Sequence, residues 1–210
     1  MNNATISEYL EKLSSSAPAP GGGSSAAVSG AMAAALVSMV ANLTIGREKY
    51  SEFQELMSEV ISQAQRLILD LTACIRKDMN AYDGVIAALR MPKSTEQEKA
   101  KRSQALQDAY KVAIAAPVET AEKSREVMEL AARLLFRSNV NAACDLSAAA
   151  LEARAGILIA IENVNVNLPG IKDSEYVWNM RAWASEIEAD SKNLLEEIRE
   201  GVARMSGGEN

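Results

Sequence analysis

Between Ser51 and about Leu89, apolar residues recur every three or four positions. Side chains at this spacing lie on one face of an α-helix, so the stretch predicts one long helix. Pro92 ends it, because a proline disfavours helical backbone in the residue before it. The apolar positions are Phe53, Leu56, Val60, Ile61, Ala64, Leu67, Ile68, Leu71, Ile75, Met79, Tyr82, Val85 and Ile86.

Other stretches with the same spacing predict further helices, and no run shows sustained alternation of apolar and polar residues flanked by hairpin turns, as paired strands would. They cover residues 5–13, 24–43, 95–136, 139–165 and 174–206. Pro117 predicts a kink or a break in the third of these. Asn163, Asn165 and Asn167 alternate with apolar residues and indicate a fraying helix end. The predicted fold class is all-α, a multi-helical bundle with long antiparallel helices, in one domain over residues 1–210.

The amino-acid composition excludes several binding partners and several kinds of catalytic site. The net charge is −6, so we expect no general attraction to nucleic acid or to an anionic membrane surface. The chain has no histidine, which excludes a histidine-based triad and the histidine form of the zinc deaminase site. Cys74 and Cys144 alone cannot complete a cysteine-only zinc site, so no metal is expected. Proton transfer therefore falls to carboxylates, Lys, Tyr or Cys.

Three features of the sequence indicate where in the cell the protein is located. Residues 1–5 lack the basic and apolar blocks of a secretory signal, and two cysteines in separate predicted helices suggest reduced thiols. Residues 24–43 carry no charge over about the length of a membrane-spanning helix, but four serines, Asn42 and many weakly apolar alanines argue against spanning. We expect a cytoplasmic protein that is not in a membrane, with this helix central in the subunit or at a subunit interface.

Two prolines and three glycines stand directly before this small-residue helix, at residues 18–23. Glycines let the backbone approach a ligand, and the free N–H groups of a helix N-terminus attract an anion. The loop is therefore either a carboxylate or phosphate site or a tight chain reversal that allows close helix packing. The residues alone favour neither. Ser24 or Ser25 is the expected N-cap.

Two aspartates lie in predicted helices. Asp78 follows Lys77, and Tyr82 lies one turn further on the same face. Aspartate is unfavourable inside a helix, so Asp78 is either a functional carboxylate or, as for most helical aspartates, a solvated charge. Asp145 shares a face with Asn141, and its apolar surroundings predict burial. A buried aspartate needs a hydrogen-bond partner, which Asn141, a helix terminus or a ligand could supply.

Three motifs carry a resemblance to a known family: PAPGGGS at residues 18–24, MVANLT at 39–44 and KDMNAY at 77–82. With residues 139–145 and 161–168, they resemble the formiminotetrahydrofolate cyclodeaminase / methenyltetrahydrofolate cyclohydrolase family over essentially the whole chain. The resemblance implies a helical subunit that forms a homodimer and binds folate in a cleft near the subunit interface. It also implies that no metal or organic cofactor is needed.

The resemblance implies roles for individual residues as well. Asp78 is the expected base, Asp145 a second carboxylate that stabilises a cation or passes a proton, and Tyr82 an aromatic partner of the substrate ring. The glycine loop would hold the pterin or the glutamate tail, helped by Arg47 or Lys49. The expected substrate-binding residues are Pro20, Gly21, Gly22, Gly23, Ser24, Thr44, Arg47, Lys49, Lys77 and Asn141.

The implied reaction is hydrolysis of 5,10-methenyltetrahydrofolate to 10-formyltetrahydrofolate. The bridging carbon of this substrate belongs to a flat cationic amidinium, so water needs only a positioned base and a nearby negative charge to attack it. One alternative is a cyclodeaminase, which releases ammonia from 5-formiminotetrahydrofolate and gives the same methenyl compound. A non-catalytic helical folate-binding or scaffold subunit is the other. Because no formiminotransferase segment accompanies this domain, we expect the cyclohydrolase.

Overall fold

The computed structural model describes residues 5–207, and this part of the chain contains helices and no strand, as predicted. Residues 1–4, on which the expectation about export partly rests, lie outside it. Three short 3₁₀ segments, η1 (Glu48–Phe53), η2 (Val140–Ala142) and η3 (Leu168–Gly170), connect the main helices. The main helices are α1 (Ile6–Leu13), α2 (Gly22–Asn42), α3 (Gln54–Leu89), α4 (Glu96–Arg133), α5 (Ala143–Asn167) and α6 (Ser174–Gly207).

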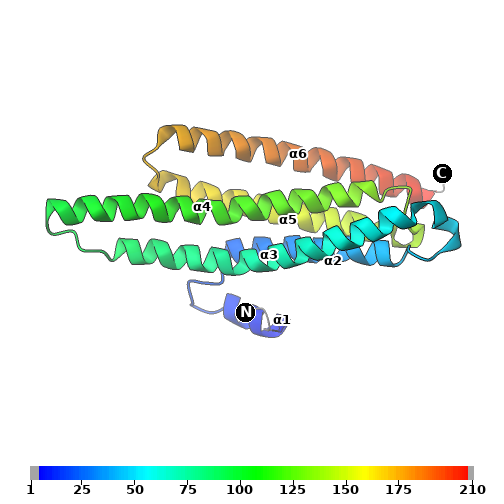
Figure 1. Cartoon of the computed structure of the whole chain (residues 1–210), viewed down its shortest axis with the longest axis horizontal. Helices are drawn as coiled ribbons and strands as arrows, with labels where there is room; N and C mark the ends of the chain where they lie inside the picture. Colours follow the sequence, from blue (N-terminus) through cyan, green and yellow to red (C-terminus); the bar gives the residue numbers. More distant parts are fainter. Residues whose placement is uncertain (1–4, 208–210) are drawn as a thin grey trace.

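The long helices run side by side along one axis (Figure 1). The α3–α4 and α5–α6 turns lie at the left end of the bundle in this view, and η1 and η2 lie at its right end. Helix α2 packs against α3, α4 and α5, whereas α1 lies outside the bundle. The predicted all-α bundle of long helices is confirmed.

Small residues explain why α2 can be central. Its alanines at positions 26, 27, 33, 34 and 41 are completely buried. A Cβ added to Gly30 would lie 2.5 Å from Oγ of Ser124, and one added to Gly156 would lie 2.9 Å from the carbonyl oxygen of Ala26. Both glycines therefore allow α2 to approach α4 and α5 more closely than larger residues would.

Helix α2 is also long and apolar enough to cross a membrane, with a mean hydropathy of 1.6 over its most apolar window. Within the bundle 56% of that window is buried. Most of its apolar surface thus lies in the protein core, against α3, α4 and α5.

Pro117 does not break the helix that contains it. Helix α4 runs from Glu96 to Arg133, and Pro117 is buried within it. A proline inside a helix removes one backbone hydrogen bond, so packing against neighbouring helices must offset this loss. The start of α4 follows the sequence signal, because Thr95 and Glu98 form a capping box.

Candidate functional site

A cleft of about 380 Å³ opens where the start of α2 meets α3 and the end of α5. The predicted glycine loop supplies one wall through Gly21, Gly22 and Gly23, and α3 supplies Asp78 and Tyr82. The structure therefore brings together the loop and the helical acid that were singled out from the sequence.

Asp78 lies directly against the first turn of α2. A Cβ added to Gly23 would be 2.0 Å from Oδ1 of Asp78 and 2.5 Å from its Cγ, so no larger residue fits at position 23. The backbone N–H of Ser24 donates a hydrogen bond to the Asp78 carboxylate. The third glycine is thus required by the close approach of a side chain from another helix.

This contact also corrects the predicted N-cap. Helix α2 begins at Gly22, and its N-cap Gly21 offers no side chain. Ser24 lies in the first turn, is completely buried, and donates its hydroxyl to the carbonyl oxygen of Gly21 at 2.8 Å. Asp78 therefore takes the place of a local cap by accepting one of the free N–H groups of the first turn. The Ser24 hydroxyl thus bonds to its own loop, and the part of Ser24 in substrate binding stays a prediction.

Burial raises the pKa of the Asp78 carboxyl above its ordinary value, and the hydrogen bond from the Ser24 backbone N–H offsets part of this rise. No charged side chain contributes to the shift. A carboxylate with a raised pKa accepts protons more readily, as a general base must. Asp78 is thus positioned to act as a general base in a partly desolvated cleft.

Beyond Asp78, the α3 wall becomes aromatic and then apolar. Tyr82 follows one turn later, with its side chain partly exposed, and Val85, Ile86 and Leu89 continue the same wall. A flat ring with a polar group at one edge would match this order, because the polar edge would meet the carboxylate and the ring would meet Tyr82.

The opposite wall contains two asparagines that were interpreted as part of a fraying helix end. Helix α5 instead continues to Asn167, and both Asn163 and Asn167 line the cleft. Each amide donates to the carbonyl oxygen four residues earlier, at 2.7 Å to Ile159 and 2.8 Å to Asn163. Their spacing of four residues, which places both on one helix face, is the sequence signal that could have revealed them.

Several predicted site residues lie at the other end of α2. Because an α-helix rises 1.5 Å per residue, Asn42 is about 30 Å from Gly22 along the axis. Arg47 and Lys49 follow Asn42 and are exposed. Neither residue can reach the glycine loop of its own subunit, so their predicted role beside that loop would require the loop of a partner subunit.

Thr44 belongs to this right-hand end as well. Its buried hydroxyl accepts a hydrogen bond from the Asn139 backbone N–H at 2.9 Å and donates to the Val40 carbonyl oxygen at 2.8 Å. The Tyr50 hydroxyl accepts from the Val140 N–H at 3.1 Å. These contacts tie the loop after α2 to the start of η2, which makes Thr44 a structural residue and not part of the cleft.

Asp145 and Asn141 are also distant from Asp78 within one subunit. Asp145 is half-buried in the first turn of α5, about 27 Å along the axis from Asn163, and Asn141 is exposed in η2. The described part of the chain contains no hydrogen bond between their side chains. Asp145 therefore cannot act with Asp78 on one substrate inside a single subunit.

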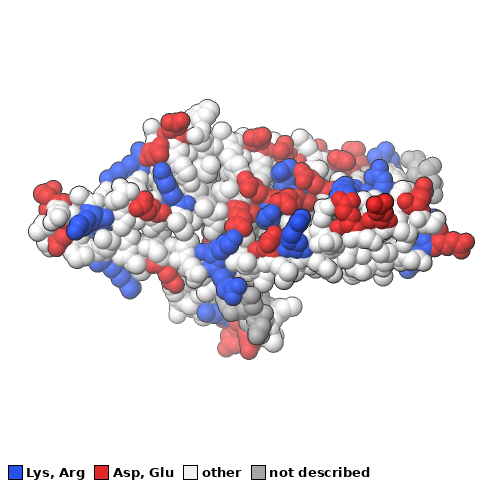
Figure 2. Space-filling model, in the orientation of Figure 1, with Lys and Arg blue, Asp and Glu red and all other residues white. Residues whose placement is uncertain are grey.

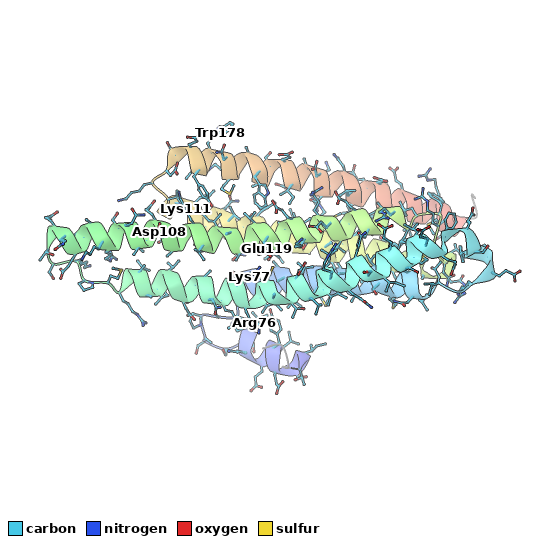
Figure 3. All side chains as sticks on the ribbon, in the orientation of Figure 1. Arg76, Lys77, Asp108, Lys111, Glu119 and Trp178 are labelled. Carbon is cyan, nitrogen blue, oxygen red and sulfur yellow. The ribbon has the colours of Figure 1, made fainter. Side chains whose placement is uncertain are left out.

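Lys77 and Pro20 complete the predicted set. Lys77 pairs with Glu119 of α4 at 2.6 Å, and Figure 3 shows the two residues facing each other between α3 and α4. Lys77 does not line the cleft, and Pro20 is buried beneath the loop. Of the predicted residues, the cleft thus contains Asp78, Tyr82 and the three glycines.

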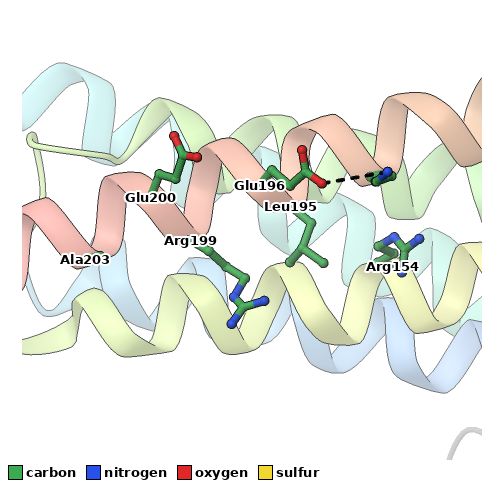
Figure 4. Close-up of a pocket in the computed structure, with 7 residues that line it drawn as sticks. Arg154, Leu195, Glu196, Arg199, Glu200 and Ala203 are labelled. Atoms are coloured by element: carbon green, nitrogen blue, oxygen red, sulfur yellow. Dashed lines mark ion pairs between the residues drawn. The ribbon is translucent and has the colours of Figure 1, made fainter.

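A larger hollow of about 500 Å³ lies between α5 and α6 (Figure 4). It is lined by Arg154, Lys192 and Arg199 together with Glu196 and Glu200, so charges of both signs meet there. It contains no residue of the glycine loop or of α3. We therefore place the candidate site in the smaller cleft, where an unpaired carboxylate meets a helix N-terminus. Within residues 5–207, no group of three acidic or cysteine side chains could hold a metal ion.

Comparisons with known proteins identify the family of this chain. A model of the formiminotransferase-cyclodeaminase family matches residues 5–186. A methenyltetrahydrofolate cyclohydrolase of Methylorubrum extorquens is 43% identical over 93% of this chain and 90% of its own length. The formimidoyltransferase-cyclodeaminase of Rattus norvegicus is 29% identical over 90% of this chain, which spans only 35% of that longer protein.

A solved structure shows the same fold. The crystal structure of formiminotetrahydrofolate cyclodeaminase from Thermotoga maritima superposes with a TM-score of 0.87 and 28% identity, covering 96% of this chain and 97% of that one. The resemblance seen in the sequence is confirmed by the family match and by this superposition. The chain belongs to the formiminotransferase-cyclodeaminase family.

Proposed function

We propose that this protein is a methenyltetrahydrofolate cyclohydrolase that hydrolyses 5,10-methenyltetrahydrofolate to 10-formyltetrahydrofolate. The observation that carries the proposal is the partly buried Asp78 carboxylate, which has no cationic partner and lies against the first turn of α2. The 43% identity to a cyclohydrolase over nearly the whole chain supports this choice of reaction.

In this reaction Asp78 accepts a proton from water while the water oxygen bonds to the cationic bridging carbon. The ionised carboxylate also stabilises the positive charge of the amidinium before attack. The resulting tetrahedral carbon then expels N5, which takes a proton, and the carbon–oxygen double bond of the formyl group forms on N10. One proton of the water ends on N5 and the other is released, which balances the loss of the substrate's positive charge.

The neighbours of Asp78 each have a defined task in this proposal. The Ser24 N–H and the α2 dipole hold the carboxylate in place and keep it ionised. Tyr82 and the apolar wall of α3 take up the flat rings and exclude water from all but the attacking position.

A cyclodeaminase is the second candidate, because the Thermotoga maritima enzyme of that name shares the fold over almost the entire chain. Two assays with purified protein distinguish the reactions. Loss of methenyltetrahydrofolate absorbance, measured against a buffer blank, should be clearly accelerated. Ammonia release from 5-formiminotetrahydrofolate should be slower; if it is much faster than the hydrolysis, the protein is a cyclodeaminase. Absence of both activities would leave a folate-binding or scaffold subunit.

We also propose that the subunit forms a homodimer through the outer face of α2 and the adjacent α5. Helix α2 has no charged residue, yet it exposes Met32 and Met39; Leu43, directly after the helix, and Leu151 of α5 are exposed as well. An apolar face of this kind on packed neighbouring helices is typical of an interface. A twofold axis perpendicular to α2 would bring Asp145 of one subunit toward the cleft of the other, the one arrangement in which Asp145 could assist the reaction.

Mixed dimers test this arrangement. Asp78→Asn and Asp145→Asn subunits, each inactive alone, should regain part of the activity when they are co-expressed, because one of the two clefts would then hold both acids. A monomer in solution, or full activity of Asp145→Asn by itself, would contradict the shared cleft while leaving the role of Asp78 intact.

A further inference from the structure

The lining of the Asp78 cleft differs from the rest of the surface in its charges. Acidic and basic side chains are spread over the visible face of the molecule (Figure 2), but within residues 5–207 Asp78 is the only charged residue that lines the cleft. The other polar side chains there are those of Tyr82, Asn163 and Asn167. The two asparagines have no part in the reaction described above, so their place in the cleft needs a separate explanation.

The hydrogen bonds of the two asparagines fix the direction in which each amide points. Nδ2 of Asn163 donates to the Ile159 carbonyl oxygen at 2.7 Å, and Nδ2 of Asn167 donates to the Asn163 carbonyl oxygen at 2.8 Å. In the reversed orientation two oxygens would meet at these distances, so Nδ2 and not Oδ1 must face the helix backbone. Each amide oxygen is therefore left to accept a hydrogen bond from elsewhere.

Both amide oxygens are accessible to a ligand. No group within residues 5–207 donates a hydrogen bond to Oδ1 of Asn163 or Asn167. In this part of the chain the one side-chain nitrogen or oxygen that is fully buried without a partner is Nε of Arg154, so neither amide oxygen is sealed inside the protein. The cleft thus presents two unpaired acceptors in addition to the Asp78 carboxylate.

Asn163 lies against the same helical turn as Asp78. A Cβ added to Gly22 would be 3.3 Å from Nδ2 of Asn163, and one added to Gly23 would overlap Asp78. Because these glycines are neighbours in the chain, the amide and the carboxylate lie at adjacent positions of the first turn of α2. Asn167 follows one turn later on the same face of α5. A flat ring that meets Asp78 at one edge therefore has the two amides close to another edge.

We propose that Asn163 and Asn167 recognise the aminopyrimidinone edge of the pterin ring, with their Oδ1 atoms accepting hydrogen bonds from its 2-amino group and N3–H. The proposal rests on the proposed function, which places the carbon that bridges N5 and N10 at Asp78. This carbon is attached to the pyrazine half of the pterin, so the pyrimidine half and its N–H donors extend away from Asp78. A ring without these donors would leave the amide oxygens unpaired, which is costly in a cleft closed to water. The asparagines thus determine which ring enters the cleft.

Binding to wild-type protein tests the proposal without an assay of turnover. Isothermal titration calorimetry compares 5-formyltetrahydrofolate with its 2-desamino-2-methyl analogue, in which a methyl group of similar size replaces the 2-amino group. The parent compound should bind on the order of 10- to 100-fold more tightly, because the analogue leaves an acceptor unpaired. Equal affinities would overturn this proposal and leave the cyclohydrolase reaction intact. If neither compound binds, both proposals fail.

Variants then assign the preference to the two amides. Asn163→Leu with Asn167→Leu keeps the size of the side chains but removes both oxygens, so the two compounds should bind with nearly equal affinity. In this double variant KM for methenyltetrahydrofolate should rise about tenfold or more with little change in kcat, since Asp78 is untouched. Asn165→Leu, the same change at the exposed asparagine between them, is the matched control and should keep the preference.

Two results with the double variant would contradict the proposal. If the preference for the 2-amino compound survives, other groups recognise the ring. If kcat falls while KM is unchanged, the asparagines support the reaction and do not select the substrate. Should the double variant fail to fold, the comparison of the two compounds with wild-type protein still decides whether the cleft recognises the 2-amino group. A protein that shows this preference but hydrolyses no methenyltetrahydrofolate would retain the ring site and refute the proposed reaction.

Discussion

Polar side chains lie next to both ends of α2, but they serve different purposes. At the C-terminal end, the Thr44 hydroxyl and the Tyr50 hydroxyl accept backbone N–H groups, so the polar groups there satisfy one another. At the N-terminal end, the Asp78 carboxylate accepts a hydrogen bond from one backbone N–H, and the rest of the carboxylate faces the cleft. Polar side chains therefore serve folding at one end of α2 and remain available to a ligand at the other.

The largest effect should come from Asp78→Asn. The amide keeps the size of the side chain but cannot accept a proton, so kcat/KM should fall about 10²–10⁴-fold. Asp83→Asn, the same change at an exposed position of α3, is the matched control and should have near wild-type kinetics. Similar losses in both variants would show that the charge of α3, and not a base in the cleft, determines activity.

Gly23→Ala should be the next most damaging change at this end. The new methyl group would overlap Oδ1 of Asp78, so either the carboxylate or the loop must move. We expect activity to fall on the order of 100-fold and the free energy of unfolding to drop by about 1–3 kcal/mol. Gly84→Ala is the control, since nothing lies near its added Cβ and alanine favours the helix. Wild-type activity of Gly23→Ala would mean that the contact with Asp78 is not needed.

At the C-terminal end of α2, Thr44→Val should reduce stability without reducing activity per folded molecule. The change leaves the buried Asn139 N–H without its acceptor, which costs about 1–3 kcal/mol. Thr72→Val, which removes a hydroxyl that only donates to the Ile68 carbonyl oxygen, should cost less in urea unfolding. A large fall in kcat for folded Thr44→Val would place this end in the active site after all.

The smallest effects concern pH. Because burial raises the pKa of Asp78, kcat/KM should fall on the acid side with an apparent pKa above the ordinary aspartate value of about 3.9. The same shift predicts that the stability contributed by Asp78 is complete below its unfolded pKa and is lost as pH rises through its raised folded pKa. Asp78→Asn should therefore be at least as stable as wild type at neutral pH. An apparent pKa at or below about 3.9 on the acid side of the kcat/KM profile would contradict the assignment of Asp78 as a desolvated base.

The helices were predictable because their signals are local. The spacing of apolar residues located α3, the capping box located the start of α4, and the motifs around the glycine loop and Asp78 indicated the family. Each of these signals depends on residues within a few turns of one another. The convergence of the glycine loop with Asp78 came from the family resemblance and not from helical spacing.

What the sequence did not show are the positions of distant parts of the chain relative to one another. Arg47 and Lys49 follow α2 closely in sequence, but the length of that helix carries them to the far end of the bundle. Ser24 obeys the local rule for a helix cap, yet a carboxylate from α3 replaces it. Lys93 and Lys172 line one hollow only because two turns far apart in the sequence lie at the same end of the bundle, which no local pattern shows.

The most direct test of the account is the position of a bound folate. A crystal structure with 5-formyltetrahydrofolate should place the pterin between the glycine loop and Tyr82, with the reactive region beside Asp78. Binding of the folate near Thr44, or in the hollow between α5 and α6, would contradict it.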